Sequence, residues 1–222
     1  MFSIKSYPFK KTNPMNKSAK AFWNWFEANH QPYLFFNQVD PTEKARLTSL
    51  LLAELHKYCD QLCFEVDNHS EGPQELTISA CGRKENFPLV EAFVAQAPKL
   101  KHWAFGAFRK RQEQNIWVRF DGIVFKTEDI WIIPYEYPAD LRLIGMRVCL
   151  KNYEAVKDVE DIMQGIYAIL DLMLGEHSFA LDIDYVEIGP VPEGDPEEEG
   201  MIEITRLPQY IEDRKKRYPR NN

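Results

Sequence analysis

Hydrophobic and polar positions change their period twice along residues 75–111, and this segment predicts a strand, a helix and a second strand. The run ELTISA alternates, with Leu76, Ile78 and Ala80 on one face. ENFPLVEAFVAQA then repeats apolar residues every three or four positions until Pro98, which is typical of an amphipathic helix. LKHWAFGAFRK alternates again, so we expect the chain to return to a strand.

Two amphipathic runs precede this segment and predict two N-terminal helices. SAKAFWNWFEANH begins at a possible N-cap, Ser18, and leaves Trp23 off its aromatic face. DPTEKARLTSLLLAELHKYCDQL has the clearest helix start in the chain, because Asp40 can cap the helix, Pro41 suits the first position and Glu43 completes a capping box. We therefore expect two helices before the first strand.

The rest of the chain predicts further strands and two more helices. LCFEVDN should pair with ELTISA as an antiparallel hairpin, and NIWVRFDG should pair with LKHWAFGAFRK across the polar loop RKRQEQN. Strands are expected within IVFKTEDIWIIPYEY, LRLIGMRVCL and LDIDYVEIG, and a core helix over DVEDIMQGIYAILDLMLGE that Gly175 ends. A last helix should bury Tyr210 and Ile211.

This order repeats strand, strand, helix, strand, once over about 62–110 and once over about 123–190. We therefore predict an α+β fold with a mostly antiparallel sheet, built from two ferredoxin-like units and preceded by two helices. Residues 1–17 are expected to be a flexible arm and 18–222 a single domain. An acidic loop at 191–200 would separate the second unit from the C-terminal helix.

Charge and length narrow the possible function classes. The chain has 222 residues and a formal net charge of -7, so it lacks the broadly cationic surface that nucleic-acid binding needs. No apolar run approaches the roughly 20 residues that cross a bilayer, and the N-terminus has no apolar signal-peptide segment. We expect a soluble, cytoplasmic protein that does not bind membranes.

The four cysteines, Cys59, Cys63, Cys81 and Cys149, leave three interpretations open. They are compatible with a metal site or with two disulfides, but no CxxC pair or matching histidine cluster completes a zinc pattern. The pattern favours four reduced thiols that pack as small hydrophobes. We predict no metal and no cofactor.

The segments FWNWF, ELTISACG and APKLKHWAFGAFRKR resemble a family of uncharacterised bacterial proteins with the signature AP-x-L-x-x-W-x-F-x-A-F. The resemblance is best over residues 22–111. It implies a bacterial, soluble α+β protein, and it implies no reaction and no catalytic residues.

Catalytic patterns are weak in this sequence. Cys81 precedes Gly82 at a strand end, but no histidine lies near it in sequence. Asp182 and Asp184 are predicted to share a strand face and offer a weak site for a hard cation. No glycine-rich phosphate loop is present.

The most informative side chains alternate on two strands that we predict to be neighbours. Trp103 and Arg109 come from the first strand and its end, and Trp117 and Arg119 from the second. One face of a sheet would then carry aromatic rings beside guanidinium groups, which suits an anionic or planar ligand. The alternative is a covered edge of the core whose arginines pair with acidic residues.

We expect a non-enzymatic binding or interaction protein, whose partner is an unknown protein or a small anionic ligand. Two alternatives stay open. One is an enzyme whose site is assembled from distant loops. The other is a regulator of an RNA-processing partner, which rests on analogy between folds alone.

Overall fold

A computed structural model describes residues 18–69, 71–113, 116–136 and 140–219. These residues form an α+β structure with three separate sheets, and they group into two compact units at 18–109 and 110–219. None of the described helices is long and apolar enough to cross a membrane. The predicted arm at 1–17 lies outside the described residues, and a single domain over 18–222 stays a prediction.

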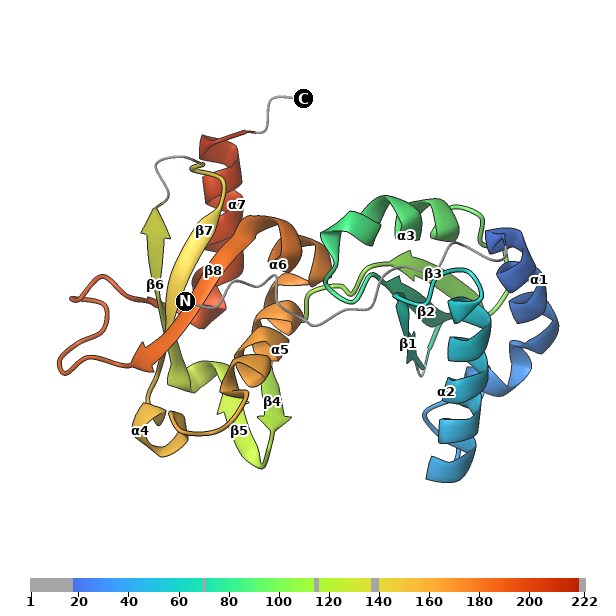
Figure 1. Cartoon of the computed structure of the whole chain (residues 1–222), viewed down its shortest axis with the longest axis horizontal. Coiled ribbons are helices and arrows are strands. Elements are labelled where there is room, and N and C mark those ends of the chain that lie inside the picture. The colour runs from blue at the N-terminus through green and yellow to red at the C-terminus, as the bar shows by residue number, and fades with distance from the viewer. Residues whose placement is uncertain (1–17, 70, 114–115, 137–139, 220–222) are drawn as a thin grey trace. The chain divides into compact units, whose positions relative to one another are not determined.

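The first unit contains three α-helices and one three-stranded sheet (Figure 1). Its elements are α1 (Ala19–Asn29), α2 (Pro41–His56), β1 (Cys63–Asp67), β2 (Gln74–Ser79), α3 (Phe87–Val94) and β3 (Trp103–Ala107), with short 3₁₀ helices at Gln31–Phe35 and Lys84–Asn86. β1 is antiparallel to β2, as predicted, with Cys63 opposite Ser79. β3 returns parallel to β2 after the helical crossover.

Aromatic side chains of α1 and β3 form the core of this unit. Phe26 of α1 is fully buried, and its ring lies 5.1 Å from that of Trp103 and 5.7 Å from that of Phe105. Trp23 is also buried, because its ring packs on Phe105 and its indole N–H donates to the Phe93 carbonyl at 2.8 Å. The prediction that Trp23 lies off the buried face was wrong, since α1 is covered from two directions.

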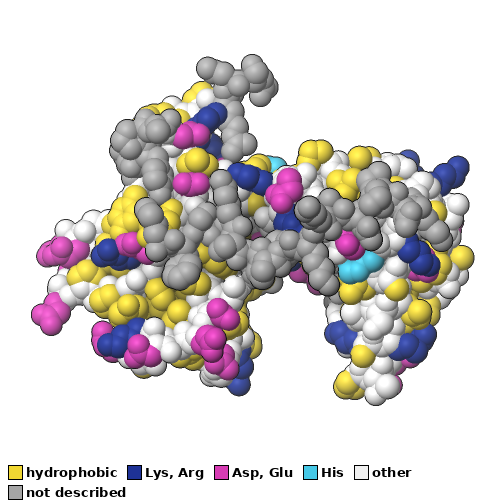
Figure 2. Space-filling view, viewed as in Figure 1, with side chains coloured by type: hydrophobic (Ala, Val, Ile, Leu, Met, Phe, Trp, Pro, Cys, Tyr) yellow, Lys and Arg dark blue, Asp and Glu magenta, His cyan; other side chains and the backbone are white. Residues whose placement is uncertain are grey.

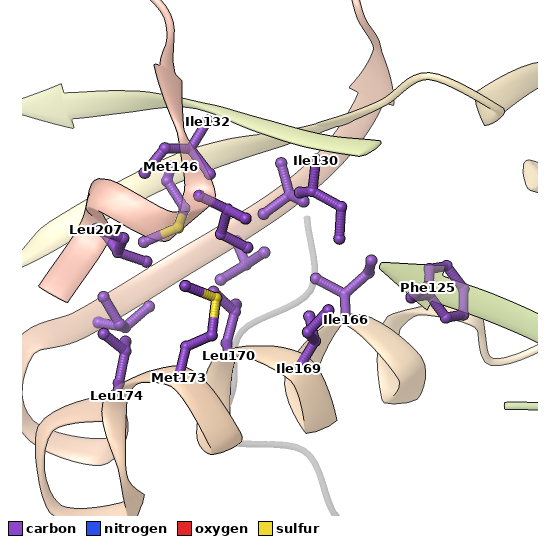
Figure 3. Packing of buried hydrophobic residues seen from close by; sticks show 14 of the residues in the cluster. Phe125, Ile130, Ile132, Met146, Ile166, Ile169, Leu170, Met173, Leu174 and Leu207 are labelled. Carbon is purple, nitrogen blue, oxygen red and sulfur yellow. The ribbon is translucent and has the colours of Figure 1, made fainter. Parts of the chain in front are cut away.

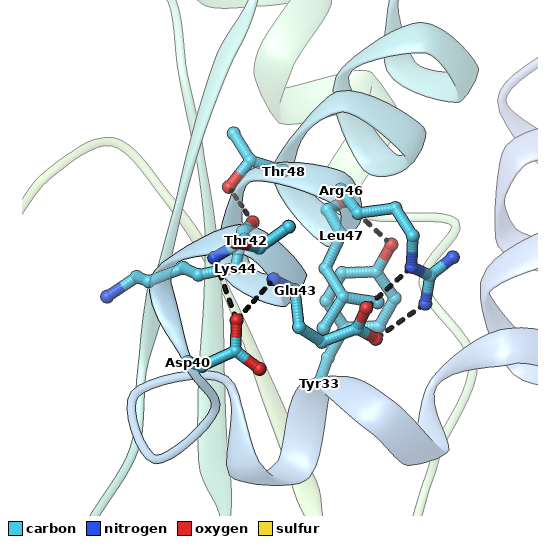
Figure 4. A network of polar contacts seen from close by, with 8 residues as sticks. All are labelled: Tyr33, Asp40, Thr42, Glu43, Lys44, Arg46, Leu47 and Thr48. Atoms are coloured by element: carbon cyan, nitrogen blue, oxygen red, sulfur yellow. Dashed lines mark hydrogen bonds and ion pairs between the residues drawn. The ribbon is translucent and has the colours of Figure 1, made fainter.

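The predicted N-cap of α2, Asp40, is confirmed, whereas the Glu43 side chain, predicted to complete a capping box, binds Arg46. The Asp40 carboxylate accepts the backbone N–H groups of Thr42 at 2.9 Å and Glu43 at 3.1 Å (Figure 4). These N–H groups have no partner within the helix, so the cap stabilises α2 by about 1 kcal/mol. Glu43 also accepts two hydrogen bonds from Arg46, and the buried Tyr33 hydroxyl donates to the Leu47 carbonyl.

The second unit contains a two-stranded and a four-stranded sheet, with helices on one face of the larger sheet (Figure 1). Its strands are β4 (Trp117–Phe120), β5 (Ile123–Lys126), β6 (Ile130–Glu136), β7 (Ile144–Leu150), β8 (Ile183–Pro190) and β9 (Ile202–Glu203). Its helices are α4 (Tyr153–Val156), α5 (Ile162–Leu174), α6 (Glu176–Asp182) and α7 (Leu207–Arg217), with short 3₁₀ helices at Thr127–Asp129 and Ile204–Arg206. The predicted acidic loop at 191–200 follows β8 and is largely exposed.

The larger sheet has the order β8-β7-β6-β9. β6 is antiparallel to β7 and to β9, whereas β8 is parallel to β7. Each unit therefore has an antiparallel pair followed by a helical crossover to a parallel strand. The predicted order strand, strand, helix, strand is present in the first unit, whereas the predicted range of about 123–190 contains β5, β6 and β7, then three helices, then β8. Among the described residues, four of the six strand pairs are antiparallel.

The core of the second unit lies between one face of this sheet and α5. Figure 3 shows Ile130, Ile132 and Met146 from the strands opposite Ile166 and Leu170 of α5, and each of these side chains is at most 2 % exposed. The apolar stripe of α5 was predicted from its period. α7 adds Leu207 and, as predicted, Ile211, while Tyr210 is only partly buried.

Two predictions about the elements were wrong. β3 does not pair with β4, because β3 joins β2 and β4 joins β5 in a separate sheet. Residues 176–182 form α6, so the last long strand begins at Ile183 rather than two residues earlier. Gly175, which has a φ of 74°, ends α5 and directly precedes α6.

The prediction of four reduced thiols was also wrong. Cys63, the first residue of β1, forms a disulfide with Cys81, just beyond the end of β2. Cys59 and Cys149 are free thiols, Cys59 half-buried and Cys149 buried. In the antiparallel register Cys63 lies opposite Ser79, so Cys81, two residues later, is near Cys63.

Candidate functional site

The β4–β5 hairpin has one apolar and one polar face. Trp117 is opposite Lys126, and Arg119 is opposite Val124 in the antiparallel register. Side chains directly opposite one another share a face, so Trp117, Arg119 and Lys126 point the same way. Because all three are exposed, we call them the hairpin patch.

The other face of the hairpin is anchored on α5. Phe125 is 2 % exposed, and Val118 and Phe120 pack against the same core. The contact is close at Gly165 of α5, where a β-carbon would lie 2.6 Å from the Phe125 ring and 3.2 Å from Phe120 Cβ. Glycine at this position therefore lets the hairpin lie directly on the helix.

Anchoring on α5 leaves the hairpin patch in solvent. Trp117 is 57 % exposed, although tryptophan buries a large apolar area in most folded proteins. Arg119 lies two residues beyond Trp117 on the same face. Nζ of Lys126 lies 3.5 Å from Oε1 of Glu128. The patch thus offers an aromatic ring beside a guanidinium group and an ammonium group.

Trp103, another of the four binding residues predicted from the sequence, belongs to the core. It is 6 % exposed, and its indole N–H lies 3.1 Å from Nδ1 of His30. The ring is also edge-on to Phe26. This environment favours the structural interpretation of Trp103.

Arg109 follows β3 and has polar partners in its own unit. Its Nε lies 3.6 Å from Oε1 of Glu65, and Nη1 donates to the Ser79 hydroxyl at 3.3 Å. Trp103 and Arg109 therefore come from the first unit, whereas Trp117 and Arg119 come from the second. The prediction that all four share one sheet face was wrong, and a binding role for each stays a prediction.

A polar cluster on the larger sheet was missed by reasoning from the sequence. Glu187 of β8 accepts hydrogen bonds at Oε1 from the Tyr135 hydroxyl at 2.7 Å and from Arg147 Nε at 2.6 Å. Its Oε2 accepts the Tyr185 hydroxyl at 2.9 Å. Three adjacent strands supply these groups, so they come together only when β8 pairs in parallel with β7.

Hydrogen bonds and burial move the pKa values of Glu187 and Tyr135 away from neutral pH. The Tyr135 hydrogen bond lowers the pKa of Glu187, burial opposes this shift, and Arg147 and Tyr185 lower the pKa further. Burial and the same carboxylate raise the pKa of Tyr135 to about 12. A phenol with a raised pKa is a poor nucleophile near neutral pH, so the cluster is better suited to holding strands together than to catalysis.

Glu187→Gln is expected to destabilise the second unit by about 1 to 2 kcal/mol at pH 7, because an amide leaves donors of the cluster unpaired. The pKa of Glu187 is lower in the folded chain than in the unfolded chain, where it is about 4.5, so the ionised carboxylate stabilises the fold at pH values above about 4.5. This stability is lost as the pH falls through the lowered pKa of the folded state. The difference from wild type should therefore shrink below about pH 4.5. Urea denaturation of both proteins at several pH values measures this difference in the free energy of unfolding. A difference that does not change with pH would contradict a stabilising role of the ionised Glu187 carboxylate.

The other chemical candidates have structural partners. Asp182 lies at the end of α6 rather than in a strand, and it accepts a hydrogen bond from Ser178 at 2.6 Å and pairs with Lys215 at 2.8 Å. Asp184 is exposed, so the predicted shared strand face was wrong. Cys81 is not a free nucleophile, because it is disulfide-bonded. Within the described parts of the chain, no group of three or more potential ligands could hold a metal ion.

Comparison with family models, curated proteins and solved structures gives no match to this chain.

Proposed function

We propose that this chain is a non-enzymatic binding protein that contacts its partner through the hairpin patch. The exposure of Trp117 carries the proposal. Exposed aromatic residues next to arginine are typical of contact surfaces, where tryptophan and arginine contribute most of the binding energy. The rigid support from α5 means that binding requires little ordering of the hairpin.

The patch fits an acidic polypeptide that also carries aromatic or apolar side chains. Trp117 would stack on an apolar or planar group, while Arg119 and Lys126 would pair with carboxylates. Figure 2 shows basic and acidic side chains interspersed on the viewed face, where the described residues form no extended basic area. That distribution and the net charge of -7 favour a protein partner over a nucleic acid.

The alternatives have less support from the described residues. An enzyme would need polar groups that converge on a substrate, whereas the Glu187 carboxylate already accepts three hydrogen bonds. A ferredoxin-like assignment of the two units, and the analogy with regulators of RNA processing, stay predictions. The resemblance to the bacterial family also stays a prediction.

The proposal is tested with a short, fluorescently labelled peptide of alternating Glu and Tyr residues. We expect the full chain to bind it, and we expect Trp117→Ala and Arg119→Glu each to weaken binding at least about tenfold, as for contact residues of this type. Phe35→Ala is the matched control, because Phe35 has the same 57 % exposure in the other unit. Fluorescence anisotropy measures the affinities.

Two results would contradict the proposal. One is equal binding by wild type and both patch variants, and the other is an equal loss of affinity in Phe35→Ala. A single-stranded RNA of similar length is titrated in parallel at physiological salt. Salt-resistant RNA binding that depends on Trp117 would replace the protein partner with a nucleic acid.

A further inference from the structure

The Cys63–Cys81 disulfide lies at one end of the β1–β2 hairpin, where the chain turns towards α3. Both cysteines are half-buried rather than enclosed in the core, which favours access of a small reductant to the bond. We infer that this bond is a reversible thiol–disulfide site, which opens in the folded protein and controls the turn at residues 80–83. Disulfides that are accessible and bound to a constrained turn are the more easily reduced ones.

The strands do not need the disulfide to stay paired. Five residue pairs hold β1 against β2, from Cys63 opposite Ser79 to Asp67 opposite Glu75. Leu76 and Ile78 of β2 are fully buried, so the core holds the same strand. Opening the bond should therefore leave the sheet intact.

The turn after β2 is the part that the bond constrains. Cys81 has a φ of 53°, in the left-handed region that non-glycine residues avoid, and Gly82 follows with a φ of 74°. This conformation is strained for a residue with a β-carbon, so it persists only where other interactions impose it. The disulfide and the hydrogen bond from the Cys81 N–H to the Ser79 hydroxyl, at 2.9 Å, are two such interactions.

The same hydroxyl connects the turn to Arg109. Ser79 Oγ accepts from the Cys81 N–H and also from Nη1 of Arg109. When the disulfide opens, Cys81 can leave the left-handed region and withdraw its N–H from Ser79. Arg109, a predicted binding residue, then changes its hydrogen-bonding environment with the redox state.

The redox step is a two-electron exchange with a dithiol. One thiolate of the dithiol attacks a sulfur of the Cys63–Cys81 bond, which breaks and leaves a mixed disulfide and one cysteine thiolate. The second thiol of the reductant attacks the mixed disulfide and releases the other cysteine. The products are two cysteine thiols, which take up the two protons, and the oxidised cyclic dithiol.

The two remaining cysteines provide internal references. Cys59 is half-buried and is expected to react with an alkylating agent while the protein stays folded. Cys149 is buried, and burial raises its pKa to about 11, so it should react only after denaturation. Folded, oxidised protein should therefore show one reactive thiol.

The experiment equilibrates the full chain with mixtures of reduced and oxidised dithiothreitol. Acid quenching, denaturation and maleimide labelling then count the thiols by mass. We expect a single transition from two to four thiols with no change in far-UV circular dichroism. We also expect hydrogen exchange at residues 80–83 to rise at least about tenfold, while the amides of β1 and β2 stay protected.

Three variants complete the test. Cys63→Ser and Cys81→Ser should each show the fast exchange at 80–83 without reductant. Cys59→Ser should show a transition from one to three thiols with the same midpoint as wild type. The inference is overturned if the bond is reduced only after unfolding, or if reduction deprotects both strands. It is also overturned if Cys59→Ser abolishes the transition, because another pairing would then be the reactive one.

Discussion

Trp103→Ala is expected to lower the free energy of unfolding of the first unit by about 3 to 5 kcal/mol. The substitution removes a ring that is 6 % exposed and lies edge-on to Phe26, and it leaves a cavity between α1 and β3. It also removes the indole donor that contacts His30. Hydrogen exchange of peptides from residues 18–109 measures the effect, because it reports the stability of that unit alone.

Trp117→Ala is the matched control, since the same residue type is replaced where it is 57 % exposed. Surface substitutions of this kind change stability by no more than about 0.5 kcal/mol. If Trp103→Ala has an equally small effect, Trp103 is not a core residue and the predicted ligand platform would regain support. The two variants thus separate the buried tryptophan from the exposed one.

Gly165→Ala is expected to destabilise the second unit by about 1 to 3 kcal/mol through overpacking. The sign is informative, because replacing a helix-interior glycine with alanine would otherwise stabilise a helix by about 1 kcal/mol. Here the new methyl group would lie 2.6 Å from the buried Phe125 ring. Thermal denaturation measures the change, and increased hydrogen exchange in 117–126 would locate it in the hairpin.

Gly189→Ala controls for the loss of a glycine in the same unit. Its β-carbon would lie 3.3 Å from Cδ of Arg147, so that side chain needs to shift by only a few tenths of an ångström and can keep its hydrogen bond to Glu187. Phe125→Leu in the Gly165→Ala background should recover part of the lost stability, because it removes the clashing ring. A stabilising Gly165→Ala would show that the hairpin does not lie against α5 as described.

The helices were predicted well wherever local signals decide them. Asp40 caps α2 through its own side chain, and the stripe of α5 has the helical period, so both can be read from neighbouring residues. Trp23 was misplaced because a second partner, Phe93, covers it from outside the main stripe. A period in the sequence cannot show that a helix packs in two directions.

Strand partners were harder to predict because alternation does not encode them. The polar loop after β3 looked like a hairpin connection, but β3 pairs with β2, which lies before α3. The disulfide had a usable signal, since pairing of 63–67 with 75–79 places Cys81 near Cys63. The Glu187 cluster had none, because Arg147 and Glu187 are 40 residues apart and meet only in a parallel pair.

The separation of 40 residues between Arg147 and Glu187 affects the order in which the strands of the second unit pair. The β4–β5 hairpin joins strands that are adjacent in sequence, so only a short loop has to close before it forms. β7 can pair with β8 only when the segment that contains α4, α5 and α6 closes into a loop. The chain loses the conformational entropy of that long segment before it gains the contacts between the two strands. The Arg147–Glu187 pair therefore forms after the β6–β7 pair, and the outer edge of β6 stays uncovered longest, because β9 must bring Glu203 opposite Trp131 across a still longer segment of chain.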